Sequence, residues 1–342
     1  MGETQHTSLP ADFAYALRKV TEIAACAAAA WIGRGEQELG DGAAVAAMRT
    51  VLNRLPIDGR IVIGEGEKDE APMLYNGETV GTGGPALDIA VDPVEGTSYL
   101  AKGLTNAMAT IAVAPRGTMF DPGPAFYMRK FAAPGAAKGT VDPTLPTREI
   151  LAELAKALGK TVSELRIYVL EKPRHKRLVR EIHEAGARTM LYPAGDVAGV
   201  IMAALPDSGI DALLGTGGTP EGLLTACAVQ ALGGEFMGKL DPQLHTEKQA
   251  VDAAGLDINH WMKLDQLVRS KDVVFCATGI TTGLLFDGVE EGNDCYRTQT
   301  LMLSGATQER QILTSWLQKQ EVDEALNAAI PHPEPETAQE GG

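Results

Sequence analysis

No hydrophobic run in the sequence approaches the roughly 18 residues that a transmembrane helix needs. The first ten residues lack the charged and apolar regions of a signal peptide, so we expect a cytoplasmic protein with no membrane partner. Basic residues number 30 against 45 acidic ones, and the net charge of −15 argues against nucleic acid as a partner. A small phosphate ester is not excluded, because a metal ion can reverse the potential inside one pocket.

The patterns that indicate zinc, disulfides or a dinucleotide are also missing. The four cysteines, Cys26, Cys227, Cys276 and Cys295, lie far apart without a CxxC pair, so we expect reduced and mostly buried thiols. The six histidines form no HExxH spacing, and no GxGxxG follows an early strand. A zinc site, a disulfide framework and a dinucleotide enzyme are therefore not expected.

The chain has 342 residues, of which 44% are hydrophobic and 38 are glycine, as is usual for a turn-rich α/β enzyme. Periodicity predicts helices over 11–34, from Asp41 onward, and over 147–158, 176–186, 197–205 and 221–232. Strands are predicted over 61–63, 87–91, 108–114, 166–170, 189–192, 210–214 and 273–276. Strand, glycine turn and helix thus alternate, which indicates an α/β fold with its sites at the carboxyl ends of strands.

The length favours two compact units over one. We expect a flexible N-terminus over 1–10, a metal-binding catalytic domain over 11–150, a second α/β domain over 151–326 and a disordered tail over 327–342.

The hexapeptide at 92–97, Asp-Pro-Val-Glu-Gly-Thr, is the most informative segment. Pro93 cannot donate to a sheet ladder, so we expect the preceding strand to stop there and to leave Asp92 and Glu95 in one loop. Two carboxylates this close repel each other, and a bridging cation removes that cost. Gly96 and Thr97 offer N–H groups and a hydroxyl to an anion such as phosphate. Metal-assisted phosphoryl transfer is therefore the first hypothesis.

Three further acids stand where an element begins or ends, and each also has a structural interpretation. Asp41 suits the N-cap of a helix, and Glu65 suits a solvated loop. Glu221 suits a first helical turn after Pro220, although this does not explain the preceding pair Gly217-Gly218.

The cluster at 174–177, Arg-His-Lys-Arg, follows Pro173 where a helix is predicted to begin. Cations at a helix N-terminus oppose the helix dipole, so the cluster is understandable if an anion lies between it and the helix. The alternative is a solvated basic turn.

Several motifs in order resemble those of the class II fructose-1,6-bisphosphatases, the bacterial branch of the lithium-sensitive sugar and inositol phosphatases. The motifs are DGAAV at 41–45, IVIGEGEKDEAPMLY at 61–75, DIAVDPVEGT at 88–97, KPRH at 172–175, GDVAG at 195–199, GGTPEG at 217–222 and ATGIT at 277–281. DPVEGT alone indicates the superfamily, whereas IGEGE together with GGTPEG is specific to this branch.

The resemblance implies a layered α/β/α/β/α fold, with the active site in the cleft between two α/β domains. It implies Mg²⁺ or Mn²⁺ held by Asp41, Glu65, Asp92, Glu95 and Glu221. It further implies substrate contacts from Glu95, Gly96, Thr97, Tyr127, Arg174, His175, Lys176, Gly195, Asp196 and Gly218. A homo-oligomer, either a dimer or a tetramer, is also implied. Ala194 departs from the family pattern, which commonly has Asp there, so recognition of the sugar hydroxyls is expected to differ.

The expected reaction removes the 1-phosphate of fructose 1,6-bisphosphate in gluconeogenesis and gives fructose 6-phosphate. Catalytic roles fall to Thr97, Glu65 and Asp92, with Thr97 orienting or helping to deprotonate the attacking water. The alternatives are a sedoheptulose-1,7-bisphosphatase or an enzyme acting on both bisphosphates, an inositol phosphatase, and a catalytically silent phosphate-binding regulator.

Overall fold

The computed structural model describes residues 9, 11–66 and 73–329, and the structural statements below concern these residues. The expected flexible N-terminus, apart from Leu9, and the expected tail from residue 330 lie outside them. Residues 327–329 were predicted as part of that tail, but they belong to α10 (Lys319–Ala329). No helix in the described ranges has both the length and the apolarity to cross a membrane.

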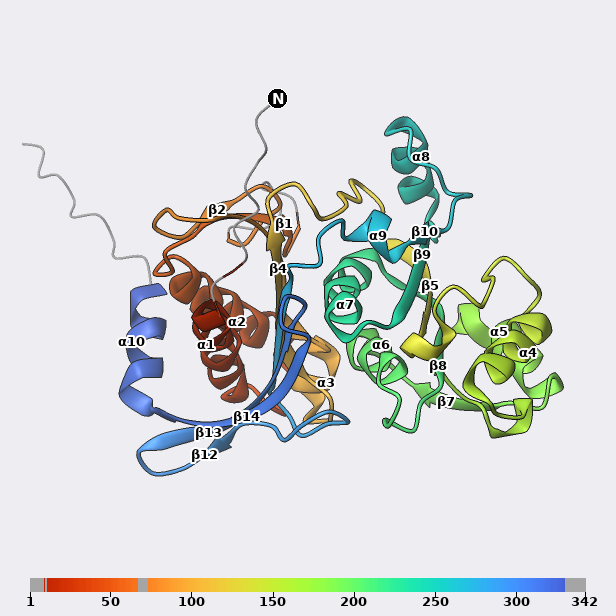
Figure 1. Cartoon of the computed structure of the whole chain (residues 1–342). Coiled ribbons are helices and arrows are strands. Elements are labelled where there is room, and N and C mark those ends of the chain that lie inside the picture. The colour runs from red at the N-terminus through yellow and green to blue at the C-terminus, as the bar shows by residue number, and fades with distance from the viewer. Residues whose placement is uncertain (1–8, 10, 67–72, 330–342) are drawn as a thin grey trace, which may run out of the picture.

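Two β-sheets organise the chain (Figure 1). The first has the order β12 (Glu290–Glu291), β13 (Cys295–Ser304), β11 (Val274–Gly279), β4 (Met108–Pro115), β3 (Ala86–Glu95), β1 (Asp58–Ile63) and β2 (Thr79–Val80), and β14 (Glu309–Gln318) also pairs with β13. The second has the order β10 (Met262–Lys263), β9 (Glu235–Leu240), β5 (Tyr127–Ala133), β8 (Ala212–Gly218), β6 (Arg166–Leu170) and β7 (Arg188–Tyr192). Both sheets mix parallel and antiparallel pairs.

Helices cover both sheets, so that the layers follow the order α/β/α/β/α expected from the resemblance (Figure 1). The layers are α1 (Ala11–Ala29), α2 (Gln37–Leu52) and α10 outside the first sheet, α6 (Asp196–Ala204) and α7 (Thr219–Leu232) between the sheets, and α4 (Thr147–Leu158) and α5 (Lys176–Glu184) outside the second. Shorter helices are α3 (Thr97–Lys102), η1 (Gly135–Ala137), η2 (Val162–Glu164), η3 (Pro173–His175), α8 (His245–Ala253) and α9 (Leu264–Leu267).

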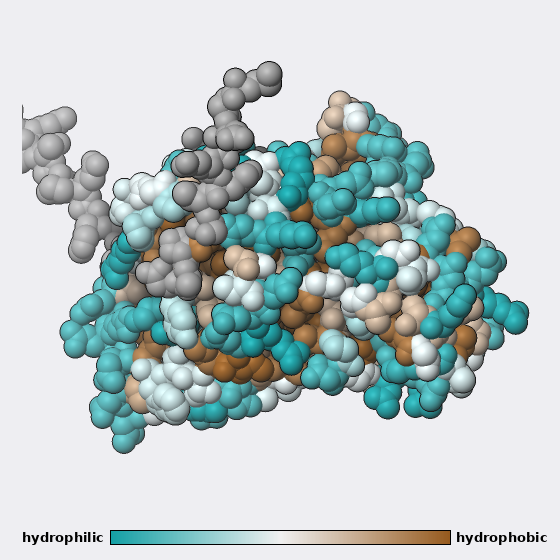
Figure 2. All heavy atoms as spheres, in the orientation of Figure 1, coloured by the Kyte–Doolittle hydropathy of each residue, from teal (hydrophilic) through white to brown (hydrophobic). Residues whose placement is uncertain are grey.

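The central layer is the most deeply buried. Leu224, Ala226, Cys227 and Val229 of α7 are fully inaccessible, because this helix has a sheet on each side and therefore needs apolar or small residues all around. All four cysteines are free thiols and three of them are buried, as the sequence predicts. Hydrophilic residues cover most of the face seen in Figure 2, with hydrophobic residues in narrower areas between them.

The sheets divide the chain at different points from the predicted domain ranges, 11–150 and 151–326. β5 belongs to the second sheet, although it lies within the first range. The strands β11 to β14 return to the first sheet, although they lie within the second range. The reason is that β11 pairs antiparallel with β4, more than 150 residues earlier in the chain, and the local alternation of strands and helices contains no signal of that return.

Candidate functional site

The strand β3 does not stop at Pro93 as predicted but continues to Glu95. Asp92 is opposite Thr110 on β4 and Glu95 is opposite Met108, so three steps along β3 match two steps along β4. One extra residue of this kind makes a β-bulge, which tolerates a proline and changes the direction of the side chains. The chain then turns at Gly96, whose φ of 85° favours glycine, and α3 begins at Thr97, which is half-buried.

The bulge brings Asp92 and Glu95 to Glu221 in the first turn of α7. One carboxylate oxygen from each of these three residues lies within 4.8 Å of the other two. The Oε2 atom of Glu221 is buried and has no hydrogen-bond partner among the described residues. A buried carboxylate oxygen without a donor is costly, and a divalent cation would supply the missing partner. The residues present therefore fit a divalent metal.

Gly217 and Gly218, which have no side chains, leave space for the carboxylates of Asp196 and Glu221. A Cβ atom on Gly218 would lie 1.9 Å from Oε2 of Glu221, and one on Gly217 would lie 1.8 Å from Oδ2 of Asp196. Real Cβ atoms do not approach this closely, so a larger residue at either position would displace a carboxylate.

Asp41 is not an N-cap, because α2 begins at Gln37 and Asp41 lies within the helix. From there its carboxyl group shares a hydrogen bond with that of Glu65, in the loop after β1. Glu65 in turn is close enough to Asp92 to raise the pKa of that group. The structure thus brings together all five acids predicted as metal ligands, with Asp41 and Glu65 as a pair beside the cluster of three.

Burial raises the pKa of each of these five acids above its ordinary value. The pKa of Glu65 rises to about 8 through burial and the nearby Asp41. The pKa of Glu95 also rises to about 8, through burial and the charges of Glu221 and Asp196. Without a cation, the carboxyl groups of this site are therefore protonated more readily than carboxyl groups in water. This is expected of buried, clustered carboxylates that bind a metal.

Lys130, on β5, is a site residue that the sequence analysis missed. Its side chain is fully buried, and Nζ lies 2.5 Å from Oδ2 of Asp196. The sequence marks Lys130 only weakly, because it stands beside a second basic residue, the exposed Arg129, in the same strand. Its charge partly offsets the repulsion at Glu221 and lowers the pKa of that acid.

The basic cluster at 174–177 does not surround one anion as the sequence suggests. Nε and Nη2 of Arg174 donate to the carbonyl of Thr216 at 3.0 and 2.8 Å, and its guanidinium lies 5.2 Å from the centre of the Tyr127 ring. Lys176 is exposed, and Arg177 forms an exposed ion pair with Glu181 at 2.7 Å. Arg174 thus holds Thr216 on β8, the strand that carries Gly217 and Gly218.

His175 uses both of its ring nitrogens within the protein. Nε2 accepts from the N–H of Thr216 at 2.8 Å, so Nδ1 carries the proton and donates to the carbonyl of Leu170 at 2.7 Å. Burial lowers the pKa of the ring, which favours the neutral form that this pairing requires. His175 is therefore placed to fix β8 against β6, with neither nitrogen left for a ligand.

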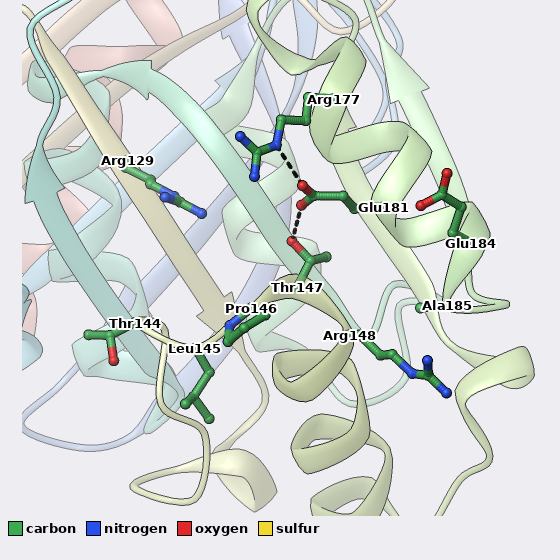
Figure 3. Close-up of a pocket in the computed structure, with 10 residues that line it drawn as sticks. All are labelled: Arg129, Thr144, Leu145, Pro146, Thr147, Arg148, Arg177, Glu181, Glu184 and Ala185. Atoms are coloured by element: carbon green, nitrogen blue, oxygen red, sulfur yellow. Dashed lines mark hydrogen bonds and ion pairs between the residues drawn. The ribbon is translucent and has the colours of Figure 1, made fainter.

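A separate cavity of about 570 Å³ lies beside α4 and α5 (Figure 3). Arg129, Thr147, Arg177 and Glu181 are among the residues that line it, and none of the five acids does. Arg177 and Thr147 both bond to the carboxylate of Glu181 within this cavity.

The raised pKa values predict how the metal-free protein responds to pH. Between about pH 4.5 and 8, folded Glu65 and Glu95 keep protons that the unfolded chain has released. Their contribution to the free energy of unfolding therefore falls as the pH rises through this window. We expect the Tm of metal-free protein to fall from pH 5 to pH 8, and Mn²⁺ to raise it more at pH 8 than at pH 5, because fewer protons need to be displaced at pH 8.

Glu221→Gln should flatten this pH dependence and abolish the stabilisation by Mn²⁺, as measured by differential scanning calorimetry. The exposed Glu184→Gln is the matched control and should behave as the wild type. Equal stabilisation of Glu221→Gln and wild type by Mn²⁺ would show that Glu221 is not a ligand.

The chain is similar to known proteins over most of its length. The family model described as "Bacterial fructose-1,6-bisphosphatase, glpX-encoded" matches residues 11–317. The chain is 44% identical over 308 residues to "Fructose-1,6-bisphosphatase 1 class 2" of Escherichia coli (strain K12), which covers 86% of this chain and 91% of that protein. The "Fructose-1,6-bisphosphatase class 2" proteins of Escherichia coli O6:H1 and Shigella flexneri match with the same identity and coverage. The chain belongs to the bacterial class II fructose-1,6-bisphosphatase family.

Proposed function

We propose that this chain is a metal-dependent phosphoric monoester hydrolase that converts fructose 1,6-bisphosphate to fructose 6-phosphate and phosphate. The observation that carries the proposal is the convergence of Asp92, Glu95 and Glu221, whose oxygens lie within 4.8 Å of one another. Family membership supports the same reaction and a role in gluconeogenesis. A cytoplasmic location fits this role.

The five acids Asp41, Glu65, Asp92, Glu95 and Glu221 would hold Mg²⁺ or Mn²⁺. Such ions, when bound, neutralise the ester phosphate and lower the pKa of a coordinated water. Asp92 and Glu95 end a strand of the first sheet, whereas Glu221 follows a strand of the second. We therefore propose that each sheet with its outer helices forms a domain, and that the metal site lies where these domains meet.

Thr97 has the position and chemistry to orient the attacking water, because it begins α3 directly after the glycine that follows Glu95. A hydroxyl can accept a hydrogen bond from water and hold it in line with the scissile bond. Glu65 and Asp92 would accept the proton that the water loses, as the resemblance implies. The N–H groups around Gly96 would stabilise charge that develops on the phosphate.

The sugar and its second phosphate would contact Tyr127, Arg174, Lys176, Gly195, Asp196 and Gly218. Arg174 supports this assignment because its guanidinium lies over Tyr127 and beside β8. The resemblance also implied contact with His175, but its two internal hydrogen bonds support a different role. We propose that His175 holds Thr216 in place and does not touch the substrate.

Phosphate release from fructose 1,6-bisphosphate, assayed with Mg²⁺ and with Mn²⁺ separately, tests the reaction and the ion. We expect release with at least one ion and none in excess chelator. The comparisons do not favour sedoheptulose 1,7-bisphosphate, and kcat/KM should be lower for it. A higher kcat/KM for the seven-carbon ester would reassign the substrate, and no release from either ester would favour a silent regulator.

Thr97→Ala should lower kcat by about 100-fold with little change in KM, because the hydroxyl acts on water in the transition state. Steady-state kinetics on fructose 1,6-bisphosphate measure this. Thr105→Ala removes an exposed hydroxyl after the same helix and should leave kcat unchanged. Turnover of the Thr97 variant within a fewfold of wild type would remove Thr97 from the mechanism.

We propose that the protein is a homo-oligomer, a dimer or a tetramer, with β14 at the contact. This strand has ten residues, and its one strand partner in the described chain is β13. Ile312 and Trp316 point to the same face and are 58% and 64% exposed. Antiparallel pairing with a second copy about Thr314 would set Ile312 opposite Trp316. The edge is therefore complementary to itself in its exposed apolar positions.

Trp316→Glu should convert the oligomer into a monomer of 36.1 kDa, because the charge would face the apolar residues of the second copy. Sedimentation velocity measures the change. Leu244→Glu, at an exposed leucine near α8, is the control and should keep the oligomer. A monomeric wild type, or an oligomeric Trp316→Glu, would rule out this contact.

A further inference from the structure

The side chain of Tyr99 connects the turn at Gly96 with the segment 194–197. It lies in α3, two residues after Thr97, and its ring is buried. Its hydroxyl donates to the carbonyl of Ala194 at 2.7 Å and accepts from the N–H of the same residue at 2.9 Å. One hydroxyl thus satisfies both backbone groups of a residue 95 positions later in the chain.

Residues 194–197, the segment to which Tyr99 bonds, also form hydrogen bonds with side chains of three other elements. The hydroxyl of Tyr168, on β6, donates to the carbonyl of Gly195 at 2.6 Å. Lys130 binds the carboxylate of Asp196, and the N–H of Val197 donates to Oε1 of Glu95 at 3.2 Å. The segment is therefore fixed at every residue, and its last contact is with one of the acids of the metal cluster.

The ring of Tyr99 packs between two glycines that belong to different halves of the site. A Cβ atom on Gly96 would lie 2.8 Å from the ring, and one on Gly195 would lie 3.4 Å from it and 3.6 Å from Oε1 of Glu95. Both glycines have positive φ angles, 85° and 75°. The hydroxyl and the ring together set the distance between the turn at Gly96 and the segment at Gly195.

We propose that Tyr99 is a positioning residue that places the sugar-binding segment 194–197 in register with the metal-binding turn. The sugar of a bisphosphate reaches beyond the metal cluster, so its binding depends on where Gly195 and Asp196 lie relative to Glu95. Metal binding depends on the carboxylates themselves, whereas the hydroxyl of Tyr99 bonds to the backbone of Ala194. This inference rests on the proposed function, since it concerns the sugar side of the same site.

Tyr99→Phe tests the proposal, because it removes the hydroxyl and keeps the ring between the two glycines. We expect KM for fructose 1,6-bisphosphate to rise about tenfold, as for the loss of two ordinary hydrogen bonds, with kcat changed far less. The dissociation constant for Mn²⁺, measured by titration calorimetry, should stay within twofold of wild type. Exchange of the Ala194 amide hydrogen should become about tenfold faster.

Tyr192→Phe is the matched control. Tyr192 stacks on Tyr168 with ring centres 4.6 Å apart, and its hydroxyl has no hydrogen-bond partner among the described residues. This variant should keep the KM, the Mn²⁺ affinity and the amide exchange of the wild type. A general disturbance of the tyrosine cluster would instead appear in both variants.

Two results would overturn the inference. An unchanged KM in Tyr99→Phe would show that the hydroxyl does not position the sugar side, and a parallel loss of Mn²⁺ affinity would show a general structural role. If the wild type releases no phosphate from fructose 1,6-bisphosphate, the proposed function fails. The exchange of the Ala194 amide then decides the positioning role alone, and unchanged exchange in Tyr99→Phe counts against it.

Discussion

The structure depends on the repulsion among five carboxyl groups that the fold brings together and largely removes from water. Asp41, Glu65, Asp92, Glu95 and Glu221 come from four segments of the chain, and burial raises the pKa of every one. Such a cluster opposes folding unless protons or cations occupy it. The surrounding layers must therefore supply enough apolar burial to hold the acids in place, and the hydrophobic cores of the fold are extensive.

The acid cluster could be predicted from the sequence because its chemistry is local. Asp92 and Glu95 flank a proline at the end of an apolar run, and Glu221 follows two glycines, so each position carries a visible departure from ordinary strand or helix composition. The local elements were predictable for the same reason: the helix at 147–158 and the strand at 166–170 have the predicted bounds. Asp41 was misplaced because a helix start several residues earlier, at Gln37, has no side-chain cap to mark it.

What the sequence could not predict depends on contacts between distant segments. The return of β11 to β4 follows from hydrogen bonding between backbones, which any two apolar strands could make. The roles of Lys130 and His175 follow from partners in other elements, Asp196 in α6 and Thr216 in β8. A buried lysine and a buried histidine look like surface residues until their partners are known. The role of Tyr99 was equally unpredictable, because its hydroxyl bonds to the backbone of Ala194, which every residue type has.

The position of α7 between the two sheets determines how the protein unfolds. This helix packs against strands of both sheets, and its first turn carries Glu221. Neither sheet can lose its order without exposing the inner face of α7, so the two halves form one cooperative unit despite their separate sheets. Partial opening would also carry Glu221 away from Asp92 and Glu95. Damage to either half would thus separate the carboxylates that a metal would need.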